Sequence, residues 1–321
     1  MSSINKYELI KVDETDQLWE ELSACSINYT PFMREDYLNC VGYEGVRYIV
    51  IKTNRPLMGI CLARNIKTGL IDSEAPFAPY QGFLYSENTG YNAYNSNLIA
   101  TEYLLDYLYK SEGFKQIEFS NYYNVKDFRA VQWHHYHERE KGTYDIRLSY
   151  TGILKLSSFS RDKMSKGRKL DLRYSTDRYG IQCNYSDNIQ DFLRLYMDTF
   201  MRENICLSDE TVGMVRSIID MAMVNDYGKM LVAYNTEGEA INATFVLTDK
   251  RRAYYIFGAN DPVYRKCGGA TLLLVNQMEM YRDETELEYF DFIGINSPQR
   301  GDFKLSFGAD IVPYFICGIK Y

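Results

Sequence analysis

The stretch Tyr254–Gly308, YYIFGANDPVYRKCGGATLLLVNQMEMYRDETELEYFDFIGINSPQRGDFKLSFG, carries the clearest structural pattern in the chain. Its first residues, Tyr254–Phe257, are β-formers and predict a strand. Residues Gly269–Asp283 are rich in leucine, valine and methionine, with no helix breaker after the first position, and predict a buried helix. A short strand, a loop and a further helix follow. This order indicates a fold in which strands and helices alternate.

The turn before the predicted helix, Arg265-Lys-Cys-Gly-Gly-Ala270, has the features of an anion-binding site. A helix N-terminus has free backbone N–H groups and a partial positive charge. Glycines at positions 268 and 269 would let a ligand approach the backbone, and Arg265 and Lys266 add full charges, so a pyrophosphate would fit. Alternatively, the two glycines only start the helix and the basic residues are solvated. The hexapeptide alone does not separate these two interpretations.

Arg265-x-x-Gly268-x-Ala270 resembles R/Q-x-x-G-x-G/A, the acyl-CoA pyrophosphate motif of the GNAT acyltransferases. The continuation 289–309 looks like the C-terminal half of the FemAB-like branch (BioF2-like, peptidoglycan-bridge), which has two GNAT-like domains in one chain. The resemblance implies a mixed α/β sheet and two tandem GNAT-like domains: residues 1–150, a basic connecting helix at 151–180, and residues 181–321. It also implies that the donor is bound by Arg265, Lys266, Gly268, Gly269 and Ala270.

Length and composition fit this organisation. The chain has 321 residues, which suggests two domains of ordinary size, and is 46% hydrophobic and 25% charged, as soluble globular proteins are. A net charge of −7 disfavours wholesale nucleic-acid binding, and DNA in particular, although a local basic patch could still act. Seven cysteines without a C-x-x-C pair favour a reducing compartment. With no secretory signal and no stretch of ~20 apolar residues, we expect a cytoplasmic protein without a membrane span.

The first half contains a segment, Leu70–Tyr85, that predicts a strand interrupted by Pro76 and Pro79. FemAB-like chains carry a similar proline-tyrosine segment, which implies that Asp72 and Tyr80 bind the acceptor. The alternative is a proline-rich edge loop in which the tyrosine is packed. Before its long predicted helix this half has SENTGY at residues 86–91 instead of the GNAT motif, so we do not expect it to hold a CoA pyrophosphate.

Residues 159–178, FSRDKMSKGRKLDLRYSTDR, are strongly basic, with seven arginines and lysines against three aspartates. Such a run is usually a solvated helix face. It could also be a cationic wall beside an anionic substrate, such as a nucleotide-linked sugar or a tRNA end, and FemAB-like proteins have a similar arginine-rich helix. On that second interpretation Arg168 and Arg173 are the substrate-binding candidates.

Three histidines, His134, His135 and His137, are all that the chain contains. On a strand His135 and His137 would share a face, as neighbouring metal ligands do. No second histidine or cysteine cluster completes a site, so we predict no metal.

Amide-forming acyl transfer needs a bound donor, a deprotonated amine, a stabilised oxyanion and a protonated leaving group. The GNAT resemblance implies that the strand Tyr254–Gly258 offers a backbone N–H to the donor carbonyl and that Tyr255 is a general acid. Lys304 matches a lysine that FemAB-like transferases place at the reaction centre, where it would stabilise the tetrahedral intermediate. An exposed lysine on an amphipathic helix is the alternative. Asp291, on an apolar strand, would be a base or a partner for Lys304 or for the substrate-binding candidate Arg300.

These features predict an N-acyltransferase that moves an acyl group from acyl-CoA to an amine of a small or sugar-linked acceptor, for example a nucleotide sugar, in cell-wall or surface-polysaccharide synthesis. One alternative is an aminoacyl-tRNA-dependent ligase of peptidoglycan bridges, and another is a binding module that has kept the fold without the chemistry. The chain contains no nucleophile-elbow, P-loop or dinucleotide-binding motif. Acceptor, acyl chain and oligomeric state do not follow from the sequence.

Overall fold

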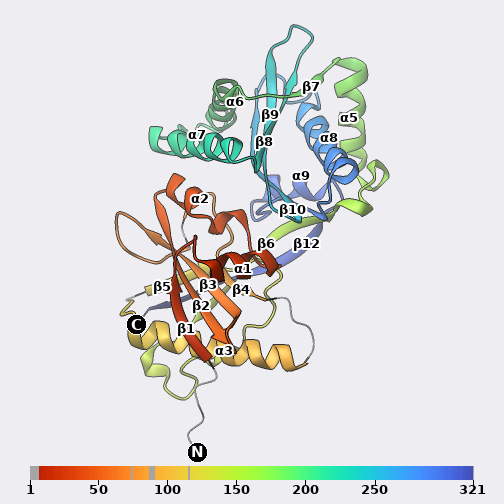
Figure 1. Ribbon diagram of the computed structural model, residues 1–321. Helices are drawn as coiled ribbons and strands as arrows, with labels where there is room; N and C mark the ends of the chain where they lie inside the picture. The colour runs from red at the N-terminus through yellow and green to blue at the C-terminus, as the bar shows by residue number, and fades with distance from the viewer. Residues whose placement is uncertain (1–6, 74, 87–90, 115, 321) are drawn as a thin grey trace, which may run out of the picture. The chain divides into compact units, whose positions relative to one another are not determined.

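The computed structural model describes residues 7–73, 75–86, 91–114 and 116–320 and divides into two compact units. Unit 1 comprises Met1–Ser149 together with Pro313–Tyr321, and unit 2 comprises Tyr150–Val312. The chain passes from one unit to the other within strands β6 (Asp145–Lys155) and β12 (Asp310–Lys320) (Figure 1). The basic segment at 151–180 therefore groups with the second unit, and the end of the chain groups with the first. The mixed α/β prediction is confirmed.

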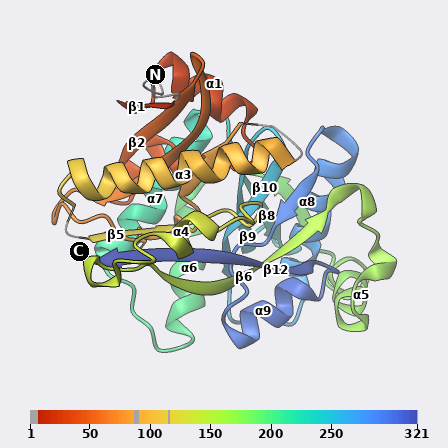
Figure 2. The ribbon, with the colours of Figure 1, turned by 90° about the horizontal axis from the view of Figure 1, so that it is seen from below.

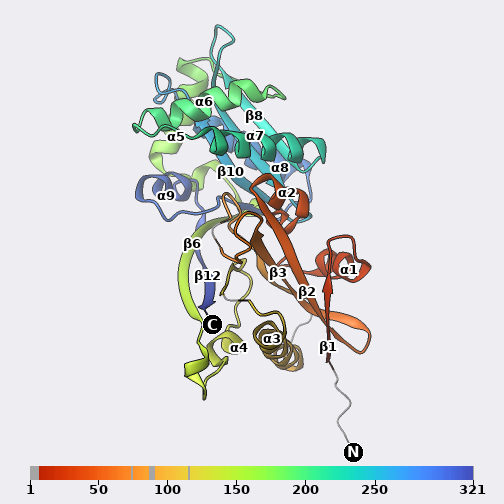
Figure 3. The same cartoon turned by 90° about the vertical axis from the view of Figure 1, so that its left-hand side faces the viewer.

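Unit 1 is built on an antiparallel sheet of order β1-β2-β3-β4. Its elements before β6 are β1 (Tyr7–Val12), α1 (Gln17–Cys25), α2 (Glu35–Cys40), β2 (Tyr43–Lys52), β3 (Arg55–Asn65), β4 (Gly82–Tyr85), α3 (Tyr91–Ser111), β5 (Gln116–Ser120) and α4 (Arg129–Trp133). Side chains alternate between the two faces of β3. Met58 and Ile60 pack with leucines of α3, whereas Gly59 lies against Leu22 of α1, so the two helices cover opposite faces of the sheet (Figures 2 and 3).

The predicted strand from Leu70 to Tyr85 is wrong over most of its length, because only Gly82–Tyr85 forms strand β4. The prolines at 76 and 79 have no N–H to donate to a ladder. Between them Phe77 takes a left-handed conformation with φ 60°, and its carbonyl accepts a hydrogen bond from the Tyr37 hydroxyl at 2.8 Å. The SENTGY stretch, where we expected no CoA site, lies mostly outside the described residues.

The histidines do not lie on a strand, the case in which His135 and His137 would share a face; they follow the short helix α4. The rings of His134 and His135 lie in contact, tilted by 33° with centroids 3.8 Å apart, and His135 has φ 53°. His134 is buried, and burial lowers its pKa to about 4, with the neighbouring His135 adding to the effect. The pair thus belongs to the packing of unit 1.

Unit 2 contains the six-strand order β6-β11-β10-β9-β8-β7. Its elements are α5 (Lys166–Arg173), which continues as a π-helical turn (Tyr174–Arg178), β7 (Gln182–Tyr185), α6 (Ile189–Met201), α7 (Asp209–Val224), β8 (Gly228–Tyr234), β9 (Ala240–Thr248), β10 (Arg252–Asn260), α8 (Gly269–Glu284), β11 (Tyr289–Asp291) and α9 (Pro298–Leu305). Helices α6 and α7 cover one face of the sheet, and α8 covers the other with α5 packed on it (Figure 1).

The predicted strand and helix of the opening stretch are confirmed as β10 and α8. Helix α8 is buried along most of its length, including Leu273, Leu274 and Val275, which explains its run of consecutive apolar residues. Ser208 caps α7 by accepting from the N–H of Thr211, as serine prefers to do. Among the described helices of both units, none combines the length and the apolarity that crossing a membrane requires.

Candidate active site

Strands β10 and β11 pair in parallel over only three positions, Arg252–Tyr254 against Tyr289–Asp291. β10 then continues to Asn260 with antiparallel β9 on one edge. Beyond Tyr254, no strand within the described residues pairs with its other edge. A register shift between Tyr255 and Phe257 adds a bulge at this point. The strands therefore separate at Tyr255, within the segment for which the GNAT resemblance implies a backbone N–H to the donor carbonyl.

Lys304, on α9, turns its ammonium toward the loop that follows β11. The Nζ atom donates hydrogen bonds to the carbonyl oxygens of Ile293 and Gly294, the latter at 3.0 Å, and lies 5.6 Å from the centre of the Tyr255 ring. Burial lowers the pKa of Lys304 to about 8; the Asp291 charge opposes this shift, and Arg300 adds to it. Lys304 is therefore half-buried and in contact with the separated strands, rather than exposed on its helix.

Asp291 is fully buried at the end of β11. Its Oδ1 atom accepts hydrogen bonds from the hydroxyl of Thr151, at 2.6 Å, and from the backbone N–H of Ile293, at 2.8 Å. This oxygen is committed to two donors, so the contacts favour a role as structural partner over a role as base.

Together with Lys304 and Asp291, Tyr255 and Arg300 form what we call the Lys304 group. The Tyr255 hydroxyl lies over Gly258, where a Cβ would come within 1.9 Å of it, so only glycine leaves room for the ring. Burial raises the pKa of Tyr255 to about 12, and Arg300 acts in the opposite direction. Arg300 is exposed and stacks on Phe200, 5.3 Å from the ring centre. The tyrosine thus keeps its proton at neutral pH and could donate it to a leaving group.

The glycine turn before α8 is enclosed by the protein itself. A Cβ on Gly268, which has φ 82°, would lie 2.2 Å from the backbone oxygen of Asp171 on α5. A Cβ on Gly269 would lie 1.9 Å from Oδ1 of Asn242, which is 2% exposed. Both glycines thus have a structural reason to be glycine. The next residue, Ala270, is half-buried on the first turn of the helix.

The two basic residues of the turn, Arg265 and Lys266, are exposed. The pKa of Glu203, at the end of α6, is lowered first by its hydrogen bond to Arg202 and further by the charges of Arg300 and Arg265. Arg265 and Arg300 therefore lie toward the same end of α6, and the motif arginine and the Lys304 group belong to one region of unit 2.

Helix α5 supplies a charge pair at the N-terminus of α8. Arg168 donates to the Thr271 hydroxyl at 3.0 Å, pairs with the Asp171 carboxylate at 2.9 Å, and lies 4.9 Å from the centre of the Phe303 ring. Thr271 in turn lies 3.4 Å from that carboxylate. A carboxylate of the chain thus stands close to the helix end that attracts anions.

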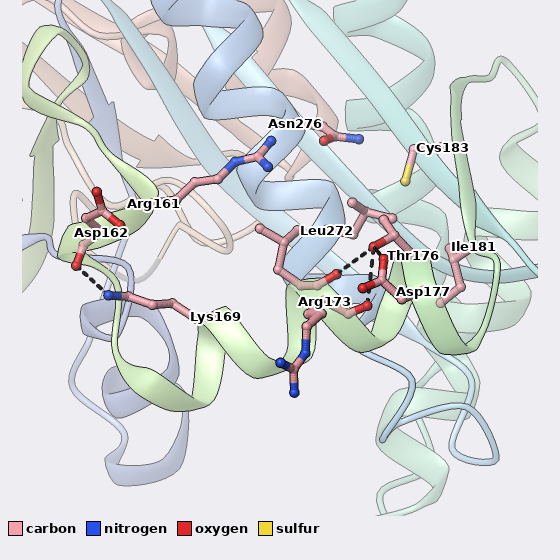
Figure 4. Close-up of a pocket in the computed structure, with 11 residues that line it drawn as sticks. Arg161, Asp162, Lys169, Arg173, Thr176, Asp177, Ile181, Cys183, Leu272 and Asn276 are labelled. Atoms are coloured by element: carbon pink, nitrogen blue, oxygen red, sulfur yellow. Dashed lines mark hydrogen bonds between the residues drawn. The ribbon is translucent and has the colours of Figure 1, made fainter.

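Arg173, the other arginine predicted from the basic segment, lies elsewhere. It lines a groove of about 590 Å³ between α5, its π-helical turn, β7 and α8 (Figure 4). Lys169 stands at one end of the groove, Leu272 and Asn276 of α8 line it, and Cys183 of β7 closes the other end. The groove has the size of a small-molecule site and a mixed polar and apolar lining.

The acceptor candidates Asp72 and Tyr80 belong to unit 1. Tyr80 is fully buried, and its ring meets those of Phe32, Tyr122 and Tyr314 edge-on, with centroids 5.0 to 5.9 Å apart. Asp72 is half-buried and accepts a hydrogen bond from Tyr43 at 3.0 Å. These contacts resemble the packed alternative for the segment more than an open acceptor site.

Three residues of the site are invisible to sequence reasoning. Thr151, Asp171 and Asn242 each act through a partner far along the chain, and none lies in a motif. The sequence Phe292-Ile-Gly-Ile-Asn offers one weak signal, since a glycine directly after a strand often marks a turn.

Comparison with known proteins gives a sequence match for the second unit and similar structures for the whole chain. Residues 158–305 match the family of GNAT-domain acetyltransferases. The crystal structure of FemX is similar with a TM-score of 0.70, at 13% identity, covering 96% of each chain. A tandem GNAT protein from the clavulanic acid biosynthesis pathway gives 0.51, at 10% identity and 98% coverage of both chains. No curated protein sequence matches the chain.

A third similar structure is the C-terminal domain of a putative lysylphosphatidylglycerol synthetase from Agrobacterium fabrum. Its TM-score is 0.51, at 11% identity, and the match covers 88% of this chain and 86% of that domain. At identities this low the likeness establishes the fold alone. The prediction of two tandem GNAT-like domains is confirmed at that level.

Proposed function

We propose that this chain, whose second unit matches the GNAT acetyltransferase domain and whose fold is that of tandem GNAT proteins, is a FemAB-like acyltransferase. It would take an aminoacyl group from aminoacyl-tRNA and transfer it to an amine. The acceptor would be a precursor of cell-wall or surface-polymer synthesis, as in the peptidoglycan-bridge branch that the sequence resembles. The proposal thus takes aminoacyl-tRNA, the alternative in the sequence analysis, as the donor in place of acyl-CoA.

The observation that carries the choice of donor is the contact between Gly268 and the backbone of Asp171. In the GNAT mode the donor pyrophosphate lies against the glycine turn. Here α5 fills the space on one side of that turn and Asn242 fills the other, and Asp171 brings a negative charge paired with Arg168. Because a pyrophosphate would meet both a steric block and a like charge, the geometry disfavours CoA at this position.

A second feature supports an RNA donor. Lys166, Lys169, Arg173 and Arg178 are exposed on α5 and its π-helical turn, and none forms an ion pair with a carboxylate of the described residues. Unpaired cations along one helix attract the phosphates of an RNA backbone. The groove beside α5 also offers room for an unstacked base, and proteins commonly recognise single-stranded RNA ends in this way.

The Lys304 group supplies the chemistry. In aminoacyl transfer an amine nitrogen bonds to the ester carbon, the ester C–O bond breaks, the ribose oxygen gains a proton and the amine loses one. The Lys304 ammonium and the unpaired backbone edge of β10 would stabilise the oxyanion, at a few kcal/mol for each contact. Tyr255, which keeps its proton to a pH of about 12, would supply the proton to the ribose oxygen.

Filter retention of aminoacylated tRNA at low salt tests the proposal. We expect wild-type protein to retain it and Lys169→Glu to weaken retention and lower the salt slope by about one. Lys250→Glu is the matched control, because Lys250 is also an exposed lysine of unit 2 but lies in the β9–β10 turn. Equal weakening by the two variants, or no retention by the wild type, would show that the donor is not bound on α5.

Acyl-CoA remains the second candidate, favoured by the match to GNAT acetyltransferases and by the exposed Arg265 of the motif. Calorimetry with acetyl-CoA decides between the two. Binding that is lost in Arg265→Ala, together with acetyl transfer to an amine, would establish this candidate instead of the first.

A further inference from the structure

The loop that holds Lys304 is itself held by two buried side chains, Thr151 and Asp291. We propose that both are positioning residues, which fix the place of the Lys304 ammonium through the turn formed by Ile293 and Gly294. The inference rests on the proposed catalytic role of Lys304. The hydrogen bonds of the two side chains lead to the backbone N–H of Ile293, and the carbonyl oxygens of Ile293 and Gly294 accept from Lys304, so the contacts run through the backbone of this turn.

The first link of this chain of contacts is rigid. Thr151 is fully buried in β6, which pairs antiparallel with β11 through Asp291 and Ile153. Its hydroxyl donates to Oδ1 of Asp291 at 2.6 Å, and the sheet fixes the backbone at both ends of this hydrogen bond. The carboxylate therefore has one preferred position, from which the same oxygen accepts the N–H of Ile293 at 2.8 Å.

The second link is strained. Ile293 has φ 44° and Gly294 has φ 57°, so two consecutive residues take the left-handed conformation. Glycine adopts it readily, but a β-branched side chain rarely does. Such a residue persists only where its surroundings enforce it, and the hydrogen bond from its N–H to Asp291 is the contact that does so here.

The third link is the lysine. The left-handed pair turns the carbonyl oxygens of Ile293 and Gly294 toward Nζ of Lys304. These two acceptors replace water around an ammonium whose burial is otherwise unfavourable. If the turn relaxed to ordinary backbone angles, the two oxygens would separate and Lys304 would leave its place beside Tyr255.

Two substitutions separate geometry from charge. Thr151→Val keeps shape and charge but removes one hydrogen bond, so the turn loosens, water reaches Lys304, and its pKa rises by about one unit or more. Asp291→Asn keeps an acceptor oxygen for both donors and removes only the charge, so the pKa of Lys304 falls. The charged groups that act on Lys304 are Asp291 and Arg300, and Arg300 is unchanged in both variants.

The readout is the titration of Lys304 by NMR, with lysine labelled with ¹³C and the signal assigned by its loss in Lys304→Met. We expect opposite shifts in the two variants and a wild-type value in Thr151→Ser. No substrate is needed, so the result does not depend on whether aminoacyl-tRNA is the donor. An unchanged pKa of Lys304 in a folded Thr151→Val would overturn the proposal.

Ile293→Gly tests whether the turn transmits the effect of Thr151. Glycine adopts the left-handed conformation without enforcement, so Thr151→Val should shift the pKa of Lys304 less in the Ile293→Gly background than alone. With a donor in hand, Thr151→Val should lower kcat about tenfold or more at unchanged KM, and Thr151→Ser should restore it. Equal shifts of the pKa in both backgrounds would show that the turn does not transmit the effect.

Discussion

Replacing Gly268 with alanine tests the enclosure of the glycine turn, on which the choice of donor depends. Two costs add at this position. A left-handed conformation costs an alanine about 1–2 kcal/mol, and φ here is 82°. The new Cβ would also lie 2.2 Å from the Asp171 carbonyl oxygen, a backbone atom that can move only if α5 shifts, and overpacking of this kind costs about 1–3 kcal/mol. We expect a total loss of about 2–5 kcal/mol.

Two other glycines of unit 2 serve as controls because neither would incur both of these costs when replaced by alanine. Gly238 has φ 83° but no atom within 4 Å of its Cβ position, so Gly238→Ala should cost only the conformational term, about 1–2 kcal/mol. Gly213 lies inside α7 with open space around it, so Gly213→Ala should stabilise by about 0.5–1 kcal/mol. The difference between positions 268 and 238 isolates the contact with α5.

Urea unfolding followed by far-UV circular dichroism measures these differences. With an m-value of about 2 kcal/mol/M, the midpoint of Gly268→Ala should fall by about 1–2.5 M. Hydrogen exchange by mass spectrometry should locate the change as faster exchange in α5 (Lys166–Arg173). If Gly268→Ala and Gly238→Ala cost the same, and exchange in α5 is unaltered, then α5 does not close the turn and the argument against acyl-CoA fails.

Three further predictions concern charged and titrating side chains. The folded-state pKa of Lys304, about 8, lies below its ordinary 10.5, so the unfolded chain binds more protons between these values; stability should rise across pH 8–10.5 and Lys304→Met should abolish that rise in urea unfolding. His134, with a folded pKa of about 4 against 6.5, should make the protein lose about 2–3 kcal/mol of stability as pH falls from 6.5 to 4, and His134→Asn should remove this loss. Arg168→Met should lower the free energy of unfolding by about 1–2 kcal/mol, measured by thermal or urea unfolding. The Asp171 carboxylate loses its cation, and the helix N-terminus beside it makes up only part of that loss; an unchanged midpoint would show that the pair contributes nothing.

The elements of unit 2 were predictable because their signals are local. Strand β10 is a run of β-formers ended by a turn, and α8 has a long run of apolar residues because the sheet and α5 bury most of it. The capping serine at 208 is equally local, since its partner Thr211 is three residues away. The prediction failed in its extent between Leu70 and Tyr85. Pro76 and Pro79 remove two ladder donors and Phe77 between them is left-handed, so a loop precedes the short strand β4.

The site was only half predictable, for a different reason. Lys304, Tyr255 and Asp291 were proposed from the sequence because they interrupt an expected pattern or match a resemblance, and the structure brings them into one region of unit 2, while their catalytic roles stay predictions. Thr151 was not, because its partner Asp291 lies 140 residues away and nothing in its own neighbourhood indicates that contact. The same holds for Asp171, which meets Thr271 at a separation of 100 residues. Contacts of this length depend on topology, which local sequence does not encode.

The motif at Arg265 shows how one sequence pattern can satisfy two different physical requirements. A pair of glycines at a helix start allows close approach of a ligand, but it equally allows close approach of another helix, and here α5 takes that place. The pattern cannot tell these apart, so its false-positive risk is highest where a second element can reach the turn. In this chain the arginine of the motif is exposed while its glycines are covered. The arginine therefore fits a ligand site, whereas the glycines fit the packing of a second helix.

The cost of uncovering the turn sets how well an acyl-CoA could compete. Lifting α5 would expose half-buried Leu172, about 1–2 kcal/mol, and break the contacts of Arg168 and Asp171 with Thr271 on α8, about 2–3 kcal/mol. A cost of about 3–5 kcal/mol weakens binding by a factor of about 10² to 10⁴. An intrinsic Kd of about 1 μM for CoA would thus become about 0.1 to 10 mM. A donor that binds the outer face of α5 avoids this free-energy cost, because it binds while α5 stays packed on the turn. The packed turn also holds in place the surface of α5 that such a donor would contact.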